Sequence, residues 1–226
     1  MIYGRRRVGK TYFFQHALEG RRGVYLLAAE SSSTENLEEL LAQIRRAFPE
    51  RTDVIRDNYP SWRVALRLLC ELAAKERSLV VFDEFSYLVS VDPSIPSILQ
   101  AVWDQDARSS QIKLVLCSSE IGLLGALDEY GRPLHGRFSW VAPYRPLDYY
   151  DTARFIRAGS LTDQSYDPRD LILVYGLLGG SGRYIAAVDP SLAVAENIAR
   201  LLREVGGASG PNCGSIRCWS RMASIR

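Results

Sequence analysis

The sequence predicts an α/β fold in which a parallel sheet is flanked by helices. Short apolar, β-branched runs alternate along the chain with segments of helical periodicity, which is the pattern of α/β proteins. Two of these runs, Leu79–Phe82 and Ile112–Cys117, have the composition of strands that are buried on both faces. Such strands occur in parallel sheets, because the helices that connect them cover both faces.

The composition is that of a folded globular chain. Of 226 residues, 47% are hydrophobic and 24% are charged, which is enough apolar material for one core and a small second domain. The net charge of +2 argues neither for nor against a nucleic-acid partner. No apolar run is long enough to cross a bilayer and no signal peptide is recognisable, so we expect a cytoplasmic protein without membrane contact. Cys70 and Cys117 lie in apolar runs and are expected to be reduced core residues.

The elements of the first domain follow in order from local patterns. Met1–Tyr3 is the end of a strand, and a helix is expected over about Lys10–Leu18. Ser33 or Thr34 can cap a helix that runs through Phe48 with one apolar face. The remaining elements expected here are strands at Gly23–Ala29, Leu79–Phe82 and Ile112–Cys117 and helices at Ser61–Lys75 and Pro96–Ala107.

A change of pattern near Pro146 marks a domain boundary. Before it, Trp140–Leu147 contains two prolines and is expected to be an edge strand or a linker. After it, the pattern is helical over Asp148–Ala158, Pro168–Leu178 and Ser191–Val205. The last stretch is rich in Gly, Ser, Arg and Cys without periodicity, and we expect it to be disordered or foreign to the fold. The chain thus divides into a core of residues 1–147, a helical part of 148–205 and a tail of 206–226.

The loop after the first strand carries the strongest chemical motif. Gly4–Thr11 reads GRRRVGKT, which satisfies the phosphate-binding pattern G-x-x-x-x-G-K-[ST]. Its glycines let successive N–H groups point at phosphate oxygens, and the following helix adds its positive end. Lys10 would reach the β- and γ-phosphates, and Thr11 would give its hydroxyl to Mg²⁺. The residues assigned to ATP contact are Gly4, Arg5, Arg6, Arg7, Val8, Gly9, Lys10, Thr11 and Tyr12.

A pair of carboxylates closes the apolar strand Leu79–Phe82. Asp83, at the end of a buried strand near the phosphate loop, can hold Mg²⁺ directly or through a water molecule. Glu84 beside it can act as the general base that polarises the attacking water. The structural alternative is that Asp83 caps the strand and Glu84 is a solvated acid. The phosphate loop upstream favours the catalytic interpretation.

Two further polar positions are candidates for contact with the γ-phosphate. Ser118 and Ser119 lie at the tip of the next apolar strand, where one hydroxyl could contact the γ-phosphate or the attacking water. A turn-forming serine pair is nearly as well supported. Arg137, in the segment Leu-His-Gly-Arg, can neutralise charge on the γ-phosphate from the same subunit or a neighbour, with a surface arginine as the alternative.

The motif set resembles the archaeal-type P-loop ATPases of the AAA+/STAND-related group, which also occur in bacteria. The resemblance covers Met1–Val205 and rests on GRRRVGKT, LVVFDEFSYL, KLVLCSSEIGLL, RPLHGRF and GGSGRYI in that order. It implies a RecA-like AAA+ sheet with a small helical lid, binding of ATP and Mg²⁺, and hydrolysis. It also implies that Ser119 is the sensor residue and Arg137 the arginine of the L-x-GR motif. Gly179–Tyr184 resembles the lid motif GG-x-P-x-Y, with Gly182 in place of the proline.

The chain departs from these relatives at both ends. They usually carry an upstream segment that completes the central strand, whereas only three residues precede Gly4 here. They also continue into a winged-helix domain, where this chain has an unpatterned tail. We therefore expect a chain that is truncated at both ends, with the tail as the product of a truncation or a reading-frame change.

The leading functional hypothesis is an ATPase that acts as a molecular switch or motor domain. Its expected partners are ATP and a protein partner or second copy of the chain, with nucleic acid reached only indirectly. The alternative is a degraded nucleotide-binding module without turnover, because a strand of three residues is short for the centre of a sheet. A P-loop kinase or GTPase is disfavoured, since the guanine-reading motif Asn-Lys-x-Asp is absent and Glu84 supplies an acid that activates water.

Overall fold

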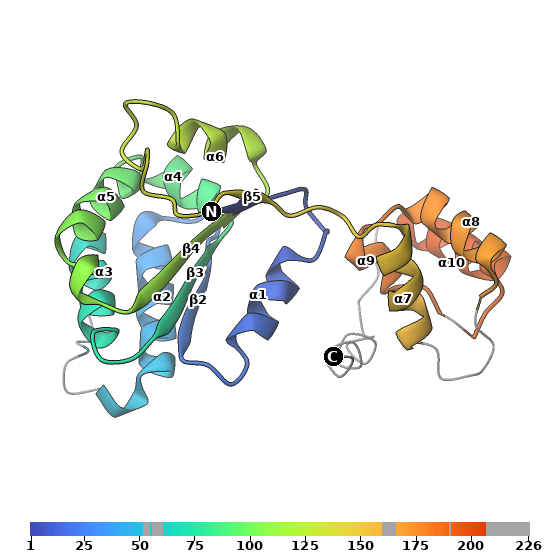
Figure 1. Ribbon diagram of the computed structural model, residues 1–226, viewed down its shortest axis with the longest axis horizontal. Helices are drawn as coiled ribbons and strands as arrows, with labels where there is room; N and C mark the ends of the chain where they lie inside the picture. The colour runs from blue at the N-terminus through green and yellow to red at the C-terminus, as the bar shows by residue number, and fades with distance from the viewer. Residues whose placement is uncertain (52–54, 56–60, 160–165, 190, 207–226) are drawn as a thin grey trace. The chain divides into compact units, whose positions relative to one another are not determined.

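The computed structural model of the protein describes residues 1–51, 55, 61–159, 166–189 and 191–206 (Figure 1). These residues form two compact units. The core unit contains Met1–Arg5 and Lys10–Tyr144, and the helical unit contains Arg6–Gly9 and the described residues from Arg145 on. Each unit is considered by itself below. The predicted tail, apart from residue 206, lies outside the described residues.

The core unit is built on a five-stranded sheet with the order β2-β3-β4-β1-β5. Every neighbouring pair is parallel, as the two continuously apolar runs predict. The α/β fold class is therefore confirmed. The strands are β1 (Ile2–Tyr3), β2 (Gly23–Leu27), β3 (Ser78–Asp83), β4 (Ile112–Ser118) and β5 (Ala142–Pro143).

Helices cover the two faces of this sheet unequally (Figure 1). Side chains of α2, α3, α4 and α5 form the large core with residues such as Leu26, Val80 and Phe82. The opposite face carries Ile2, Val81 and Cys117, which pack against Phe14 of α1. The helices and helical turns of the unit are α1 (Lys10–Leu18), α2 (Ser33–Ala47), η1 (Pro49–Arg51), α3 (Trp62–Leu72), α4 (Phe85–Val91), α5 (Ile95–Gln105), η2 (Ala107–Ser109) and α6 (Ile121–Leu127).

The cap of α2 is one residue earlier than the sequence predicts. Ser32, rather than Ser33 or Thr34, is the N-cap, because its hydroxyl accepts from the Glu35 N–H at 3.1 Å. The Glu35 carboxylate in turn accepts from the Ser32 N–H at 3.0 Å, which completes a capping box. The Ser33 hydroxyl is used elsewhere, since it accepts from the Trp62 indole N–H at 2.8 Å.

The proline-containing segment before the boundary forms a strand only at β5. Ala142–Pro143 pairs with β1 at the edge of the sheet, where a proline leaves no ladder hydrogen bond unmade. The rest of Trp140–Leu147 is irregular, so the predicted strand was too long. The short helices α4 and α6 were not predicted.

The helical unit has a small core of its own. Its helices are α7 (Tyr149–Gly159), α8 (Pro168–Leu178), α9 (Gly182–Ile185) and α10 (Val194–Gly206). Phe155, Leu171 and Ile185 are among the side chains buried between them. Helix α10 begins three residues after the predicted start, because the Ser191 N–H and hydroxyl bind the Asp189 carboxylate in a turn. In the part of the chain that the structure describes, no helix is long and apolar enough to span a membrane.

Candidate functional site

The phosphate-binding pattern lies between the end of β1 and the start of α1. Gly4 donates its N–H to the Ser118 carbonyl at 3.2 Å, and a Cβ on Gly4 would lie 2.3 Å from the carbonyl oxygen of Tyr144. Only glycine fits there. Gly9 has a φ of 109°, which L residues rarely adopt. Because α1 begins at Lys10, its unpaired N-terminal N–H groups lie at the end of the loop.

Lys10 is a buried cation whose partners are two carbonyl groups. Its side chain is 5% exposed, and Nζ donates to the carbonyls of Gly4 at 2.7 Å and Arg5 at 3.0 Å. Among the described residues, no carboxylate lies within ion-pair distance of Nζ. An ammonium has three N–H donors, so one remains for a further acceptor. A buried ammonium without a counter-ion is costly, and an anion at this loop would compensate it.

Asp83 is a buried anion at the carboxyl end of β3. Its side chain is fully buried, and Oδ2 accepts from the Thr11 hydroxyl at 2.7 Å and from the Tyr25 hydroxyl at 2.7 Å. Oδ1 accepts from the Glu84 N–H at 3.0 Å. Within the described ranges, no Lys, Arg or His forms an ion pair with this carboxylate. A carboxylate and a hydroxyl in direct contact are hard oxygen ligands, so the residues present fit Mg²⁺.

Tyr25 is a residue of this site that the sequence analysis missed. It lies on β2 opposite Val81, and the next same-face position of β2, Leu27, is opposite Asp83. Burial and the hydrogen bond to Asp83 raise the pKa of Tyr25, so its hydroxyl stays protonated and donates. In the sequence, Tyr25 lies within an apolar run and carries no signal of this role. The role depends on how β2 pairs with β3, which the sequence alone does not specify.

The general-base candidate Glu84 is held by the sensor candidate Ser119. Glu84 follows β3 in the left-handed conformation, with a φ of 53°, and its side chain reaches the tip of β4. Glu84 Oε2 accepts from the Ser119 N–H at 3.1 Å and from the Ser119 hydroxyl at 2.7 Å. Ser118 differs, since it is fully buried and its hydroxyl donates to the Ser86 hydroxyl at 2.9 Å. The structure thus brings Ser119, and not Ser118, to the carboxylate pair.

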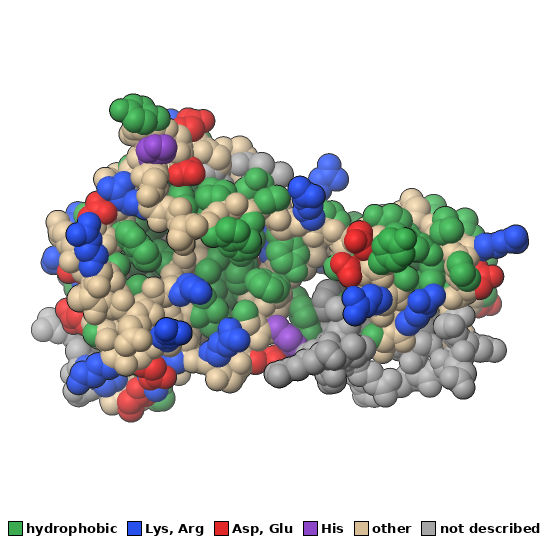
Figure 2. Space-filling view, viewed as in Figure 1, with side chains coloured by type: hydrophobic (Ala, Val, Ile, Leu, Met, Phe, Trp, Pro, Cys, Tyr) green, Lys and Arg blue, Asp and Glu red, His purple; other side chains and the backbone are tan. Residues whose placement is uncertain are grey.

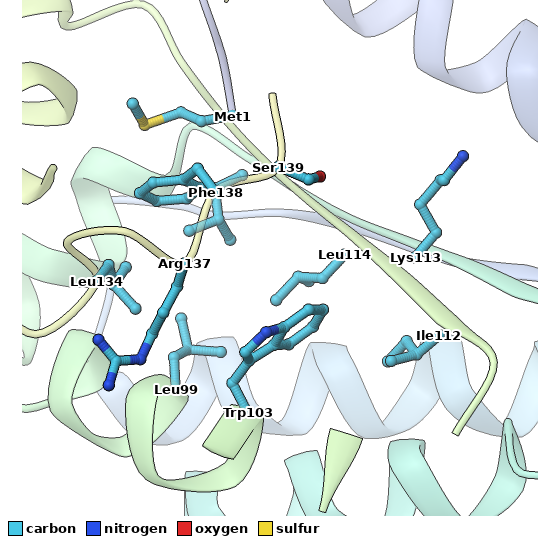
Figure 3. A pocket seen from close by; sticks show the side chains of 11 residues that line it. Met1, Leu99, Trp103, Ile112, Lys113, Leu114, Leu134, Arg137, Phe138 and Ser139 are labelled. Atoms are coloured by element: carbon cyan, nitrogen blue, oxygen red, sulfur yellow. The ribbon is translucent and has the colours of Figure 1, made fainter. Parts of the chain in front are cut away.

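Arg137 is paired with an acid on α5. Its Nε and Nη2 donate to the two carboxylate oxygens of Asp104 at 3.0 Å and 2.7 Å. The same side chain lines a pocket with Leu99, Trp103 and Leu134 (Figure 3). Among the described residues, no hydrogen bond or ion pair joins Arg137 to Lys10, Asp83 or Glu84. The structure therefore does not bring this predicted residue to the others within one chain.

The outer turn of the loop, Arg6–Gly9, belongs by its contacts to the helical unit. The Arg7 carbonyl accepts from the Ser181 hydroxyl at 2.9 Å and from the Arg183 N–H at 3.3 Å. The Arg7 guanidinium donates to the Tyr184 hydroxyl at 2.8 Å. Arg7 has a φ of 70°, unusual for a residue with a side chain. Within the helical unit, the GGSGRYI segment therefore contacts the outer turn at Arg7.

The remaining loop candidates are placed as follows. The side chains of Arg5 and Arg6 are exposed, and that of Val8 is buried. The ring of Tyr12 stacks on His16 of the same helix, with 4.8 Å between centroids. On the face shown in Figure 2, the Lys and Arg side chains of the described residues are scattered rather than gathered over one element.

The chain matches a known family of ATPase domains and two uncharacterized archaeal proteins. A family model described as an ATPase domain predominantly from Archaea matches residues 1–188. The uncharacterized protein MJECL04 of Methanocaldococcus jannaschii is 24% identical over 189 residues, which are 83% of this chain and 38% of that protein. The uncharacterized protein MJ0424 of the same organism is 25% identical over 91 residues, which are 38% of this chain and 86% of that protein.

Solved structures share the fold. The Walker-type ATPase PABY2304 of Pyrococcus abyssi has a TM-score of 0.66 and 22% identity, and the match covers 99% of this chain and 66% of that one. The ORC2 protein of Aeropyrum pernix in its ADPNP–ADP complexes has a TM-score of 0.61 and 20% identity, and covers 97% of this chain and 61% of that one. The ORC1 protein of Aeropyrum pernix in complex with DNA has a TM-score of 0.56 and 16% identity, with 99% and 58% covered. The chain thus spans under two thirds of the length of most of these relatives.

Proposed function

The chain belongs to the family of ATPase domains found predominantly in Archaea, and we propose that it binds ATP together with Mg²⁺ and hydrolyses the γ-phosphate. The observation that carries the proposal is a pair of opposite buried charges at one loop. Lys10 has no carboxylate partner and Asp83 has no cationic partner among the described residues, yet Thr11, the residue after Lys10, donates to Asp83 at 2.7 Å. A nucleotide phosphate with a divalent cation supplies both missing charges.

The roles of the loop residues follow from their contacts. Lys10 would keep its bonds to the loop carbonyls and give its third N–H to a phosphate oxygen. The N–H groups at the start of α1 would donate to the same phosphates. Thr11 and Asp83 would hold Mg²⁺, which when bound neutralises charge on the β- and γ-phosphate oxygens.

Glu84 is proposed as the general base for the attacking water. Its Oε2 accepts both hydrogen bonds from Ser119, whereas Oε1 has no hydrogen-bond partner among the described residues and can accept a proton. Ser119 would fix the direction of the carboxylate. Arg137 is paired with Asp104 of α5 and makes no hydrogen bond or ion pair with the described residues of the phosphate site in its own chain. We therefore propose that it acts on a nucleotide bound by a second copy of the chain.

We propose that the regions predicted from the sequence have separate roles. Residues 1–147 would form the ATPase core and residues 148–205 a helical lid. The tail, 206–226, is proposed to take no part in the chemistry. The whole would act as a switch or motor whose state follows the nucleotide, through a protein partner or a second copy.

Two measurements on purified protein test this function. Binding of a fluorescent ATP analogue should require Lys10 and should strengthen when Mg²⁺ is added. Release of inorganic phosphate from ATP should require Glu84. Failure of the unaltered chain to bind ATP at millimolar concentration, with Mg²⁺ present, would refute the proposal.

A binding module without turnover is the second candidate, favoured by the length of β1. This inner strand, between β4 and β5, has two residues, and it pairs with β4 at Cys117 and Ser118. A strand so short gives the loop little support. A rise in melting temperature with ATP and Mg²⁺, combined with no phosphate release, would select this candidate over the ATPase.

A further inference from the structure

The Asp83 carboxylate lies in a row of side chains from three neighbouring strands. Tyr25 of β2 reaches it from one side, through a hydrogen bond of 2.7 Å to Oδ2. On the other side lies Cys117 of β4, the residue after Leu116, which pairs with Phe82. Its fully buried thiol has its pKa raised, first by burial and then by the charge of Asp83. The carboxylate is therefore enclosed by a hydroxyl donor and a neutral thiol.

The hydrogen-bond donors around Asp83 have different roles. Thr11 gives Oδ2 a hydrogen bond and is itself proposed to bind Mg²⁺, and the Glu84 N–H binds Oδ1 from the adjacent residue of the backbone. Tyr25 is a side-chain donor to this carboxylate that has no other proposed role, and its hydroxyl is a stronger donor than the thiol of Cys117, which also contacts Asp83. The hydrogen bond from the Tyr25 hydroxyl uses one lone pair of Oδ2 and so determines which lone pairs of the carboxylate remain for a cation.

We propose that Tyr25 is the positioning residue of the Mg²⁺ site. Its hydroxyl orients the Asp83 carboxylate and so lowers the Mg²⁺ concentration that is needed to strengthen nucleotide binding. The proposal rests on the proposed function. It follows from chemistry that is general for metal sites, in which hydrogen-bond partners of the ligands orient them and their loss typically weakens metal affinity 10- to 100-fold. Tyr25 would not touch the metal or the phosphates, so binding of ATP without metal would not depend on it.

The test is Tyr25→Phe, which removes the hydroxyl and keeps the ring. Binding of a fluorescent ATP analogue is measured in EDTA and then across a titration of MgCl₂ at fixed nucleotide. We expect the Mg²⁺ midpoint to rise by about tenfold, while the affinity in EDTA changes by less than about twofold. A role in folding alone would move both values together.

Tyr144→Phe is the matched control. Tyr144 is partly buried against the same small cluster as Tyr25, and burial likewise raises the pKa of its hydroxyl. It makes no hydrogen bond to Asp83, so its substitution should leave the Mg²⁺ midpoint unchanged. An equal shift in both variants would overturn the inference.

Two other results would also overturn it. An unchanged midpoint in Tyr25→Phe would show that Thr11 and Glu84 suffice to place the carboxylate. A lower midpoint would show that the hydroxyl competes with the metal. In both cases the unaltered chain still binds the nucleotide with Mg²⁺, so the proposed function stands, whereas absence of any Mg²⁺ effect in the unaltered chain would overturn the proposed function together with this inference.

Discussion

Replacement of Glu84 by Gln separates nucleotide binding from hydrolysis. In the structure, both donors of Ser119 bind the single oxygen Oε2 of Glu84. A glutamine side chain has the same shape, and its amide oxygen can accept both bonds. The amide nitrogen would then stand where Oε1 is now. Glu84→Gln should therefore fold, keep the contact with Ser119 and lose only the ability to take a proton.

The size of each effect follows from these contacts. Hydrogen bonds to a neutral acceptor are weaker than those to a charged one by about 1 kcal/mol, so the two bonds predict a loss of stability of up to about 2 kcal/mol. A general base typically contributes 10²–10⁴ in rate, which corresponds to about 3–5 kcal/mol in the transition state. Phosphate release should thus fall by at least about 100-fold, while ATP affinity stays within about threefold.

The assay follows phosphate release at saturating ATP and Mg²⁺, with nucleotide affinity measured on the same preparations. Glu120→Gln is the control, because Glu120 is exposed and follows Ser119 directly, and its carboxylate makes no hydrogen bond or ion pair within the described part of the chain. It should behave as the unaltered protein. Turnover of Glu84→Gln within about threefold of the unaltered rate would refute the assignment of Glu84 as general base.

Three further changes test the phosphate loop, the core and the helix cap. Lys10→Ala removes the buried ammonium and should weaken ATP binding by at least about 100-fold by calorimetry; retained binding would contradict the loop assignment. Leu40→Ala, at a fully buried site of α2, should lower the free energy of unfolding in urea by about 2–5 kcal/mol, and a loss below about 1 kcal/mol would place Leu40 outside the core. Hydrogen bonds from Ser32 lower the pKa of Glu35 from 4.5. That stabilisation is present above pH 4.5 and is lost as the pH falls through the lowered pKa of Glu35. Between about pH 6 and pH 3, Ser32→Ala should therefore lose less stability than the unaltered protein. An equal loss in both would contradict the capping box.

The parts of the fold that the sequence predicted well are those with a strong local signal. The strands β3 and β4 and the helix α8 are continuous or periodic patterns, and the structure has them within one residue of the predicted bounds. Helices α4 and α6 were missed for the opposite reason. Each has seven residues, and α4, with the sequence FSYLVSV, is composed of residues that favour strands. Packing of Phe85 and Leu88 in the main core outweighs that preference.

The candidate site divides in the same way. Lys10, Thr11, Asp83 and Glu84 were found because the chemistry requires them at a fixed spacing or at the end of a strand. Tyr25 depends on the pairing of two strands that are more than fifty residues apart in the chain, so no local pattern could indicate it. The predicted role of Arg137 requires a position relative to the phosphates, and sequence order carries no such distance.

The burial of Lys10 and Asp83 explains why this site would depend on its ligand. Each charge is taken out of water by the sheet and the loop. Lys10 donates hydrogen bonds to two backbone carbonyls, and Asp83 accepts them from Thr11, Tyr25 and the Glu84 N–H. These hydrogen bonds satisfy the donors and acceptors of the two side chains but supply no opposite charge, which costs stability at a site of low dielectric constant. A phosphate beside the ammonium and a divalent cation beside the carboxylate compensate both at once. A metal-free nucleotide would compensate Lys10 and add negative charge near Asp83, so under the proposed function the site would bind the nucleotide and the cation as a pair.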